Sequence, residues 1–313
     1  MPVSDQTAGR PTIAGVGISH ADRMVFPRTR STKLDVARYY ESIARWMLPH
    51  LVDRPLTLVL CPAGIPATGA RKGSDCLYMK HAKAWGPSAI RRVKIREKTK
   101  VGEYLIIDTL EALVSVIQMN ALEIHTWNST FARVERPDRI VIDLDPGAGV
   151  TWRCVIDAAK LVHAILAALE LESFVKTTGG RGLHVVIPID PVADWSACLD
   201  FARAVAAALV RRRPEIFTEK FAKTGRERKI LVDYLRNNRT NTSIAAFSTR
   251  ARPDATVSTP LAWRELSPGR TPETFTMATV PQRLRSQRAD PWAAYWSTAQ
   301  RLPRHAVRAL EGM

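Results

Sequence analysis

Residues 139–147 read RIVIDLDPG, an aliphatic run that contains Asp143 and Asp145 and is ended by Pro146 and Gly147. Side chains two positions apart on a strand point to the same face, so a strand here places both carboxylates side by side. Two such charges beside an apolar run are costly unless a cation lies between them, because desolvation and repulsion both disfavour the doubly ionised form. A divalent metal ion would supply that cation, although a D-x-D pair is also common in solvated turns.

Two downstream stretches favour the metal site over the turn. Residues 229–237, KILVDYLRN, form a further apolar strand with Asp233 in mid-run, where an unpaired carboxylate is unexpected. Residues 176–188, KTTGGRGLHVVIP, form a Gly-rich turn that leads into an apolar strand. Glycines let a backbone approach a ligand closely, so Arg181 and His184 can reach phosphate oxygens there. No G-K-[ST] follows, which excludes a Walker A loop, and a tight turn with an incidental arginine stays open.

The composition predicts a polyanionic partner. The chain has 313 residues, a net charge of +16 and a pI of about 10.2, with arginine spread along its length. Nucleic acid is the leading partner and an acidic membrane surface the second. No apolar run reaches membrane-spanning length and no signal peptide is evident. The cysteines form no C-x-x-C, so we expect neither a zinc ribbon nor a disulfide framework, and a reduced cytoplasm; they are Cys61, Cys76, Cys154 and Cys198.

The N-terminal part predicts a flexible arm over residues 1–16 and a helix that begins near Leu34 and is capped by Thr32. Arg23 and Lys33 lie beside the start of this helix. They could hold a phosphate together with the free backbone N–H groups and the helix dipole, or they could merely solvate a surface.

The middle of the chain offers further candidates for contacts with nucleic acid. In residues 76–85, Lys80 and His81 alternate with aromatic residues, as suits cations on phosphates and rings on bases, or a plain surface strand. His125 lies in a predicted strand, ALEIHTW; a lone histidine there is usually structural, and only its place before the acidic strand puts it near the site. Helices are expected over 151–171 and 195–213, an irregular segment over 265–290 and closing helices over 291–313.

Several motifs together resemble a known family. IDLDPG, TTGGRGLH and VDYLRNNRTNTSIAAFSTRARP, in this order and spacing, resemble the polymerase domain of bacterial ligase D, a member of the archaeo-eukaryotic primase superfamily. SHADRMVFP, TKLDVARYY, CLYMKHA and ALEIHTW extend the resemblance. It implies an α/β (α+β) fold with an RRM-like catalytic half packed on a second α/β half. The catalytic domain would span residues 17–290 and a helical closing segment residues 291–313. The sequence contains no ligase or phosphoesterase module, so we expect an excised domain or a stand-alone relative.

The resemblance also implies roles for individual residues. Asp143, Asp145 and Asp233 match the acids that hold two divalent ions, Mn²⁺ being favoured over Mg²⁺. Residues that match triphosphate-binding positions are Thr178, where the family often has serine, Arg181, His184, Arg226 and Lys229. Arg23 and Lys33 fall near the site for the 5′-phosphate of a downstream strand.

The expected function is a template-dependent nucleotidyltransferase that adds NTPs or dNTPs at short gaps or broken DNA ends bearing a 5′-phosphate, in non-homologous end joining or gap filling. We expect a cytoplasmic monomer that acts on DNA, away from membranes, with Ku and a DNA ligase as candidate partners. Two other classes stay open. A D-x-D glycosyltransferase is disfavoured by the charge and by the third acidic strand. A non-catalytic DNA-end binding module would fit a chain whose acids hold no metal.

Overall fold

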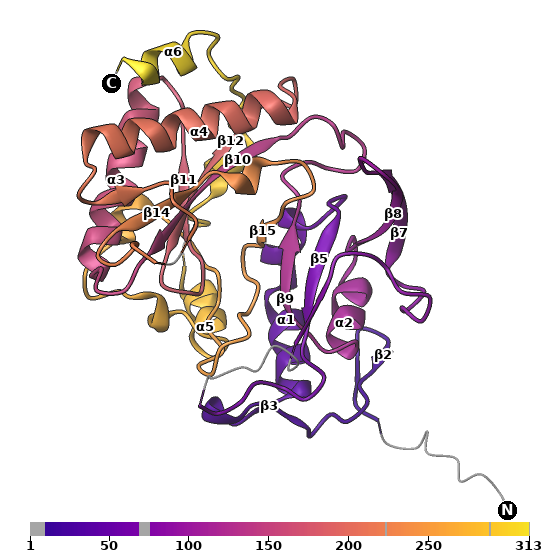
Figure 1. Cartoon of the computed structure of the whole chain (residues 1–313). Coiled ribbons are helices and arrows are strands. Elements are labelled where there is room, and N and C mark those ends of the chain that lie inside the picture. The colour runs from indigo at the N-terminus through magenta and orange to yellow at the C-terminus, as the bar shows by residue number, and fades with distance from the viewer. Residues whose placement is uncertain (1–9, 69–75, 223, 288, 313) are drawn as a thin grey trace, which may run out of the picture.

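The computed structural model describes residues 10–68, 76–222, 224–287 and 289–312, and in them helices and strands form two α/β halves that lie side by side (Figure 1). The expected α/β (α+β) class is confirmed. Among the described residues, no helix combines the length and the apolar character that crossing a bilayer requires.

The first half is built on a sheet with the strand order β15-β9-β5-β6. Its central strands, β5 and β9, pair antiparallel, and α1 packs on α2. The elements of this half are β1 (Thr12–Ile13), β2 (Val16–Gly17), β3 (Met24–Phe26), β4 (Ser31–Thr32), α1 (Lys33–Met47), β5 (Leu56–Leu60), β6 (Leu77–Met79), the hairpin β7 (Arg91–Arg96) and β8 (Val101–Ile106), α2 (Leu110–Gln118) and β9 (Ala121–Thr126).

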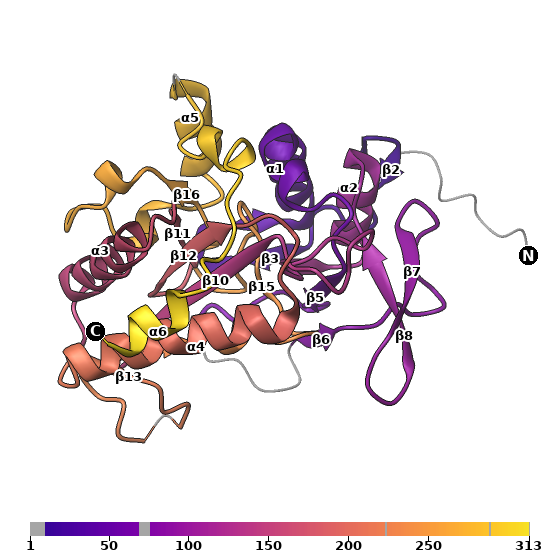
Figure 2. The ribbon, with the colours of Figure 1, turned by 90° about the horizontal axis from the view of Figure 1, so that it is seen from above.

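The second half is built on a sheet with the order β13-β14-β10-β12-β11-β16. Its elements are β10 (Arg139–Pro146), α3 (Trp152–Ala168), β11 (Phe174–Thr177), β12 (Leu183–Pro188), α4 (Trp195–Arg212), β13 (Phe217–Thr218), β14 (Ile230–Asp233), β16 (Pro260–Leu261), α5 (Thr279–Ser286) and α6 (Ala306–Glu311). Seen from above, α6 lies along α4, and α5 lies near α1 (Figure 2). Strand β15 (Ser243–Ile244) lies between β14 and β16 in sequence but pairs with β9 of the first sheet, so it joins the two halves.

The predicted start of α1 is confirmed. The Thr32 side chain accepts a hydrogen bond from the Asp35 backbone N–H, and the Asp35 side chain accepts one from the Thr32 N–H, which completes a capping box. Ile43 and Met47 belong to the buried stripe of this helix.

Alternation along β10 determines where the acids point. Ile140, Ile142 and Leu144 join the main core, to which α3 and α4 contribute their buried faces. Val141 points to the opposite face, where Trp292 and Tyr295 of the C-terminal segment cover it. Asp143 and Asp145 continue the Val141 face, so they lie on the side of the sheet away from α3 and α4.

Several boundaries differ from the expected ones. Residues 1–9 of the predicted arm lie outside the described residues, whereas β1 and β2 pair as a hairpin and Ile13 is buried. Helix α5 lies within the segment expected to be irregular, and the strand expected over residues 229–237 ends at Asp233. The expected closing segment holds a short turn of helix at Ala293–Trp296 and then α6.

The expectation that no disulfide forms is wrong for Cys61 and Cys76, which are bonded. Strands β5 and β6 are antiparallel neighbours with Leu60 opposite Leu77, so the next residue on β5 and the preceding one on β6 face each other. Their Cα atoms are 4.3 Å apart. Fifteen positions of sequence separation conceal this register, and residues 69–75 of the intervening loop lie outside the described residues. The other cysteines, Cys154 and Cys198, are free thiols.

Candidate active site

A row of charged side chains crosses the second sheet at one level. In the antiparallel register Lys176 of β11 lies opposite His184 of β12, His184 opposite Asp143 of β10, and Asp143 opposite Asp233 of β14. Directly opposed residues share a face. Asp145 lies two positions further along β10 on that same face. The predicted cluster of three acids is therefore assembled by neighbouring strands that are far apart in sequence.

Arginines balance these acids. Arg236 Nε lies 3.0 Å from Asp143 Oδ2, and Arg236 Nη2 lies 3.0 Å from Asp233 Oδ2. Arg226 Nη2 donates to Asp145 Oδ2 at 2.7 Å. Each acid thus has a guanidinium partner, and one guanidinium bridges the opposed pair.

The pKa values of the row follow burial and charge. Burial alone would raise the pKa of Asp143, but His184 and Arg236 outweigh it and hold that pKa well below its ordinary value. The pKa of Asp233 shifts in the opposite direction. Burial, with repulsion from Asp143, raises it to about 6 despite Arg236. Burial and the nearby Lys176 lower the pKa of His184 to about 4. The row therefore holds a persistent carboxylate beside one that titrates near neutrality.

A cavity of about 220 Å³, called the acid cavity below, opens over this row. It is lined by side chains of both halves and of the turn between β11 and β12, namely His125, Asp143, Asp145, Thr178, Gly180, Arg181, Gly182, His184, Arg236, Ile244, Arg250 and Arg252. The structure thus brings six of the thirteen predicted site residues into one lining, His125 among them. Because the lining is rich in cations and carboxylates, it suits a phosphate-bearing ligand better than an apolar one.

The turn between β11 and β12 is held tightly against β10. Gly179 has φ +66°, and a Cβ on Gly182 would lie 2.2 Å from the Leu144 carbonyl oxygen. The Thr178 hydroxyl accepts from the Gly180 N–H at 3.1 Å, and Arg181 donates to the Pro146 carbonyl at 3.0 Å. The glycines thus allow the turn to approach the acidic strand, as the sequence predicts.

The donor set fits a hard divalent cation in its chemistry, since all three groups are carboxylates on one sheet face. In the described residues, no group of three or more His, Cys, Asp or Glu side chains already converges at ligand distances. The arginine pairs explain this, because Arg236 lies between two of the acids. Binding of an ion to Asp143 and Asp233 would therefore require Arg236 to turn away, toward an incoming anion.

Two residues predicted to bind the triphosphate, Arg226 and Lys229, lie outside the lining of the acid cavity. Arg226 borders a neighbouring hollow that also contains Asp145, Gly147 and Arg181. Lys229 donates to the Pro214 carbonyl at 2.8 Å and lines neither hollow. Arg226 can thus reach a ligand beside Asp145, whereas Lys229 is directed elsewhere.

Arg23 and Lys33 form a separate group at the start of α1. Lys33 Nζ donates to the Gln118 carbonyl at 2.8 Å, and Arg23 donates to the Asn120 side chain. Burial, together with Arg23, lowers the pKa of Lys33 to about 8. Arg23 Nε is buried and makes no hydrogen bond within the described residues. Two cations side by side suit an anion.

Lys80 and His81 are held by an acid of the β7–β8 hairpin. His81 Nε2 lies 2.7 Å and Lys80 Nζ 3.6 Å from Glu97 Oε1. Nearby Leu77, Tyr78 and Trp85 are exposed. These two cations therefore lie on an outer surface and do not line the acid cavity.

Some residues at the site lie outside the set predicted from the sequence. Arg236 could have been found, because it follows Asp233 by three positions and a turn after the strand brings it back over the acids. Arg250 and Arg252 lie in a stretch that resembles the family but had no role assigned. Lys176 is a buried member of the row that does not line the cavity, and its ammonium donates to the Ile244 carbonyl and the Ser258 hydroxyl. Only the strand order shows that these residues belong to the site.

Comparison with known proteins identifies the family. A sequence model described as "LigD, primase-polymerase domain" matches residues 32–292. The chain belongs to the LigD primase-polymerase domain family. The LigD resemblance drawn from the motifs is thereby confirmed, and with it the nucleotidyltransferase class of the domain.

Two individual LigD proteins are similar to this chain over most of its length. The "Multifunctional non-homologous end joining protein LigD" of Pseudomonas aeruginosa is 37% identical over 304 residues, which cover 97% of this chain and 35% of that protein. The LigD of the same description from Mycolicibacterium smegmatis is 34% identical over 255 residues, 80% of this chain and 32% of that protein. The chain thus spans about a third of the length of these relatives.

A solved structure confirms the fold. The polymerase domain of Mycobacterium tuberculosis ligase D, in complex with DNA, superposes with a TM-score of 0.78 at 29% identity, covering 86% of this chain and 94% of that one. The RRM-like catalytic half packed on a second α/β half, which the LigD resemblance implied, is accordingly the architecture found here.

Proposed function

We propose that this chain is a template-dependent nucleotidyltransferase that adds NTPs or dNTPs to a primer at short gaps or broken DNA ends. The observation that carries the proposal is the opposition of Asp143 and Asp233 on adjacent strands, with Asp145 beside them, under a cavity lined with cations. The relatives described as non-homologous end joining proteins support end joining as the pathway. Gap filling in excision repair would use the same site.

In this proposal Asp143, Asp145 and Asp233 hold divalent ions, and we propose two, Mn²⁺ or Mg²⁺. Ions bound there would lower the pKa of the primer 3′-hydroxyl and neutralise the triphosphate and the leaving pyrophosphate.

The chain's own residues do the rest. Arg181, His184 and the Thr178 hydroxyl bind the triphosphate from the β11–β12 turn, and Arg226 reaches it from beside Asp145. Arg236, once it leaves the acids, places its charge on the phosphates. Cations fixed in a partly enclosed cavity stabilise the charge that develops as pyrophosphate departs.

The second anchor is the pair formed by Arg23 and Lys33, which we propose binds the 5′-phosphate on the far side of a gap. The net charge of +16 supports a DNA partner, as does the solved relative in complex with DNA. Ku and a DNA ligase are proposed protein partners, on the ground that the relatives are end-joining proteins. Relatives of this kind act in bacteria, which supports an action on chromosomal DNA in the cytoplasm.

Primer extension on a short-gapped duplex tests the proposal. The downstream strand carries a 5′-phosphate or a 5′-hydroxyl, the metal is Mn²⁺ or Mg²⁺, and the nucleotides are NTPs or dNTPs. We expect metal-dependent, templated extension that the 5′-phosphate enhances. A protein that binds the duplex but extends nothing under any of these conditions would instead be a non-catalytic DNA-end binding module.

A further inference from the structure

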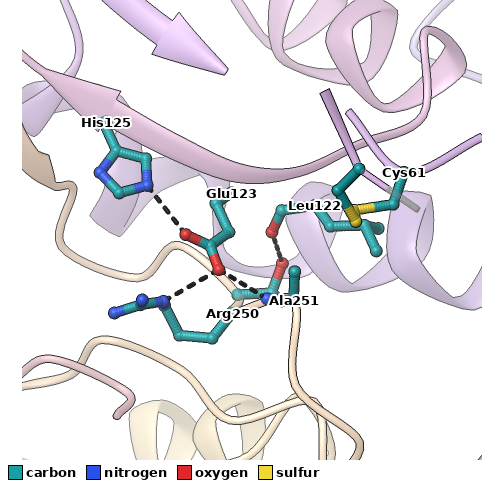
Figure 3. The surroundings of a disulfide bond; sticks show 8 residues. Cys61, Leu122, Glu123, His125, Arg250 and Ala251 are labelled. Carbon is teal, nitrogen blue, oxygen red and sulfur yellow. Dashed lines mark hydrogen bonds and ion pairs between the residues drawn. A yellow bond between two sulfur atoms is a disulfide. The ribbon is translucent and has the colours of Figure 1, made fainter. Parts of the chain in front are cut away.

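Glu123 of β9 is a buried carboxylate that the proposed chemistry does not use. Its side chain lies between His125 of its own strand and Arg250 of the segment after β15 (Figure 3). Oε2 lies 2.9 Å from His125 Nε2, and Oε1 lies 3.1 Å from Arg250 Nε and accepts from the Ala251 N–H at 2.9 Å. Glu123 itself is only 4% exposed. One carboxylate thus accepts hydrogen bonds from His125 and Ala251 and forms an ion pair with Arg250.

The two side chains that Glu123 holds line the acid cavity, and Glu123 does not. Arg250 also donates from Nη1 to the Thr178 carbonyl at 2.8 Å. A continuous set of contacts therefore runs from Glu123 through Arg250 to the β11–β12 turn. A displacement of Glu123 would be felt at His125, at Arg250 and at the turn that carries Thr178.

The charges explain why an acid is needed at this position. Burial lowers the pKa of His125, and the nearby Arg250 and Arg236 add to this effect against the opposing Glu123. Burial would raise the pKa of Glu123, but His125 and Arg250 hold it well below its ordinary value, so the side chain stays ionised. Without this carboxylate Arg250 would lose its charged partner inside the protein.

Strand β9 gives Glu123 a fixed base. β9 pairs with β5 on one side and β15 on the other, with Val59 opposite Glu123. The Cys61 N–H donates to the Asn120 carbonyl at 2.9 Å, and the Cys61–Cys76 disulfide ties the end of β5 to β6 next to this strand (Figure 3). A carboxylate on such a base can hold a side chain in one orientation.

We propose that Glu123 is a positioning residue that orients Arg250 for binding the triphosphate of the incoming nucleotide and fixes the tautomer of His125 beside it. The inference rests on the proposed function for the identity of this ligand. Nε2 of His125 carries its proton toward Glu123, so Nδ1 of the neutral ring is an acceptor, and the donor to a phosphate oxygen is Arg250. Arg250 is held by its ion pair with Glu123 and by the hydrogen bond from Nη1 to Thr178, which leaves Nη2 to face an anion.

The variant Glu123→Gln tests this with little change of shape. A neutral amide loses the ion pair with Arg250, and it cannot accept from Ala251 with one end and from His125 with the other. With its oxygen toward Arg250, its NH₂ faces His125, so Nε2 must accept and the proton moves to Nδ1. The matched control is Glu265→Gln, because Glu265 also pairs with two arginines, Arg270 and Arg283, away from the acid cavity.

Two readouts are required together. The first is the ¹⁵N NMR signature of the His125 ring, which we expect to change from the Nε2–H to the Nδ1–H tautomer in Glu123→Gln only. The second is calorimetric binding of inorganic tripolyphosphate in EDTA, which we expect to weaken about tenfold in Glu123→Gln and less than about twofold in Glu265→Gln. In extension assays KM for the nucleotide should rise by a similar factor while kcat changes little.

A variant that keeps the His125 tautomer, or that keeps wild-type affinity for tripolyphosphate, would overturn the inference. If Glu123→Gln does not fold, Glu123→Asp keeps the charge but shortens the reach by one methylene. Glu123→Asp must then show the same loss of tripolyphosphate affinity. An unchanged affinity of this variant would overturn the inference. If the wild-type protein binds tripolyphosphate, loses that affinity in Glu123→Gln, and yet extends no primer, the proposed function is refuted and this inference stands.

Discussion

Arg236 balances two acids at once, which makes it the most informative single residue for the metal-free protein. In Arg236→Gln, Asp143 and Asp233 face each other without a guanidinium. At pH 8 we expect a loss of about 1–3 kcal/mol in the free energy of unfolding in EDTA, because a partly buried carboxylate pair is left unbalanced. Mn²⁺ should then raise Tm more than it does in the wild type, since a cation replaces the lost charge.

Thermal denaturation in EDTA and in Mn²⁺ measures both effects. Arg153→Gln is the control, because the Arg153–Asp157 pair is exposed (69% and 58%) and such pairs contribute about 0–1 kcal/mol. Equal melting temperatures of Arg236→Gln and the wild type in EDTA would show that the arginine does not balance the acids.

At this scale the sequence predicts the acids and their partners His184 and Arg226, but not Arg236. Asp143 and Asp145 were found from strand periodicity, and Asp233 from an unexpected charge in an apolar run. Glu123, Arg250 and Lys176 gave no such signal, because each looks ordinary in its own segment. Their role depends on contacts between segments up to 128 positions apart, as between Glu123 and Ala251.

The turn between β11 and β12 depends on Gly182. Its Cβ in Gly182→Ala would lie 2.2 Å from the Leu144 carbonyl oxygen, so β12 must move away from β10 next to the Asp143–His184 pair. We expect a loss of about 1–3 kcal/mol in stability from overpacking. We also expect weaker tripolyphosphate binding by calorimetry. Gly269→Ala, where no atom lies within 4 Å of the added Cβ, should be close to neutral in both measurements. A neutral Gly182→Ala would contradict the close approach of the turn.

The start of α1 predicts a pH dependence. Lys33 has a pKa of about 8, so it is largely charged at pH 7 and largely neutral at pH 9. The stimulation of extension by a downstream 5′-phosphate should therefore fall as pH rises through about 8. Loss of stability does not explain such a fall. The folded pKa lies below the ordinary value of 10.5, so the unfolded chain binds more protons between them and this group's contribution to stability rises with pH in that window.

The ratio of rates on 5′-phosphate and 5′-hydroxyl substrates, measured from pH 6.5 to 9.5, checks this prediction, with flanking pH values chosen around that pKa. Lys33→Met should give a low ratio that does not vary with pH. A wild-type ratio that stays constant across the range would remove Lys33 from phosphate binding.

Element by element, strongly patterned segments were predicted well and register was not. The capped α1, the strand β10 and the helices α3 and α4 follow from local periodicity and caps. Helix α5 was missed because proline and threonine mask its short apolar stripe. The disulfide was missed because only the β5–β6 register brings Cys61 and Cys76 together.

The whole molecule combines a positive charge with a cavity between two halves that β15 joins. Binding to a gapped duplex should thus release counterions, and affinity should fall about 10³-fold between about 50 and 200 mM salt if six phosphates are contacted. Fluorescence anisotropy across a salt series measures the slope. An affinity that does not vary with salt would contradict DNA binding through surface charge. It would favour another class of nucleotide-binding enzyme, such as a D-x-D glycosyltransferase.

The central claim is that the opposed acids of β10 and β14 perform nucleotidyl transfer, and Asp143→Asn and Asp233→Asn test it most directly. Asp157→Asn, an exposed acid on α3, is the control. Templated extension of a gapped primer in Mn²⁺ should fall at least about 100-fold in each site variant, while DNA affinity stays within about twofold and the control is unchanged. Extension retained by both site variants would contradict the account.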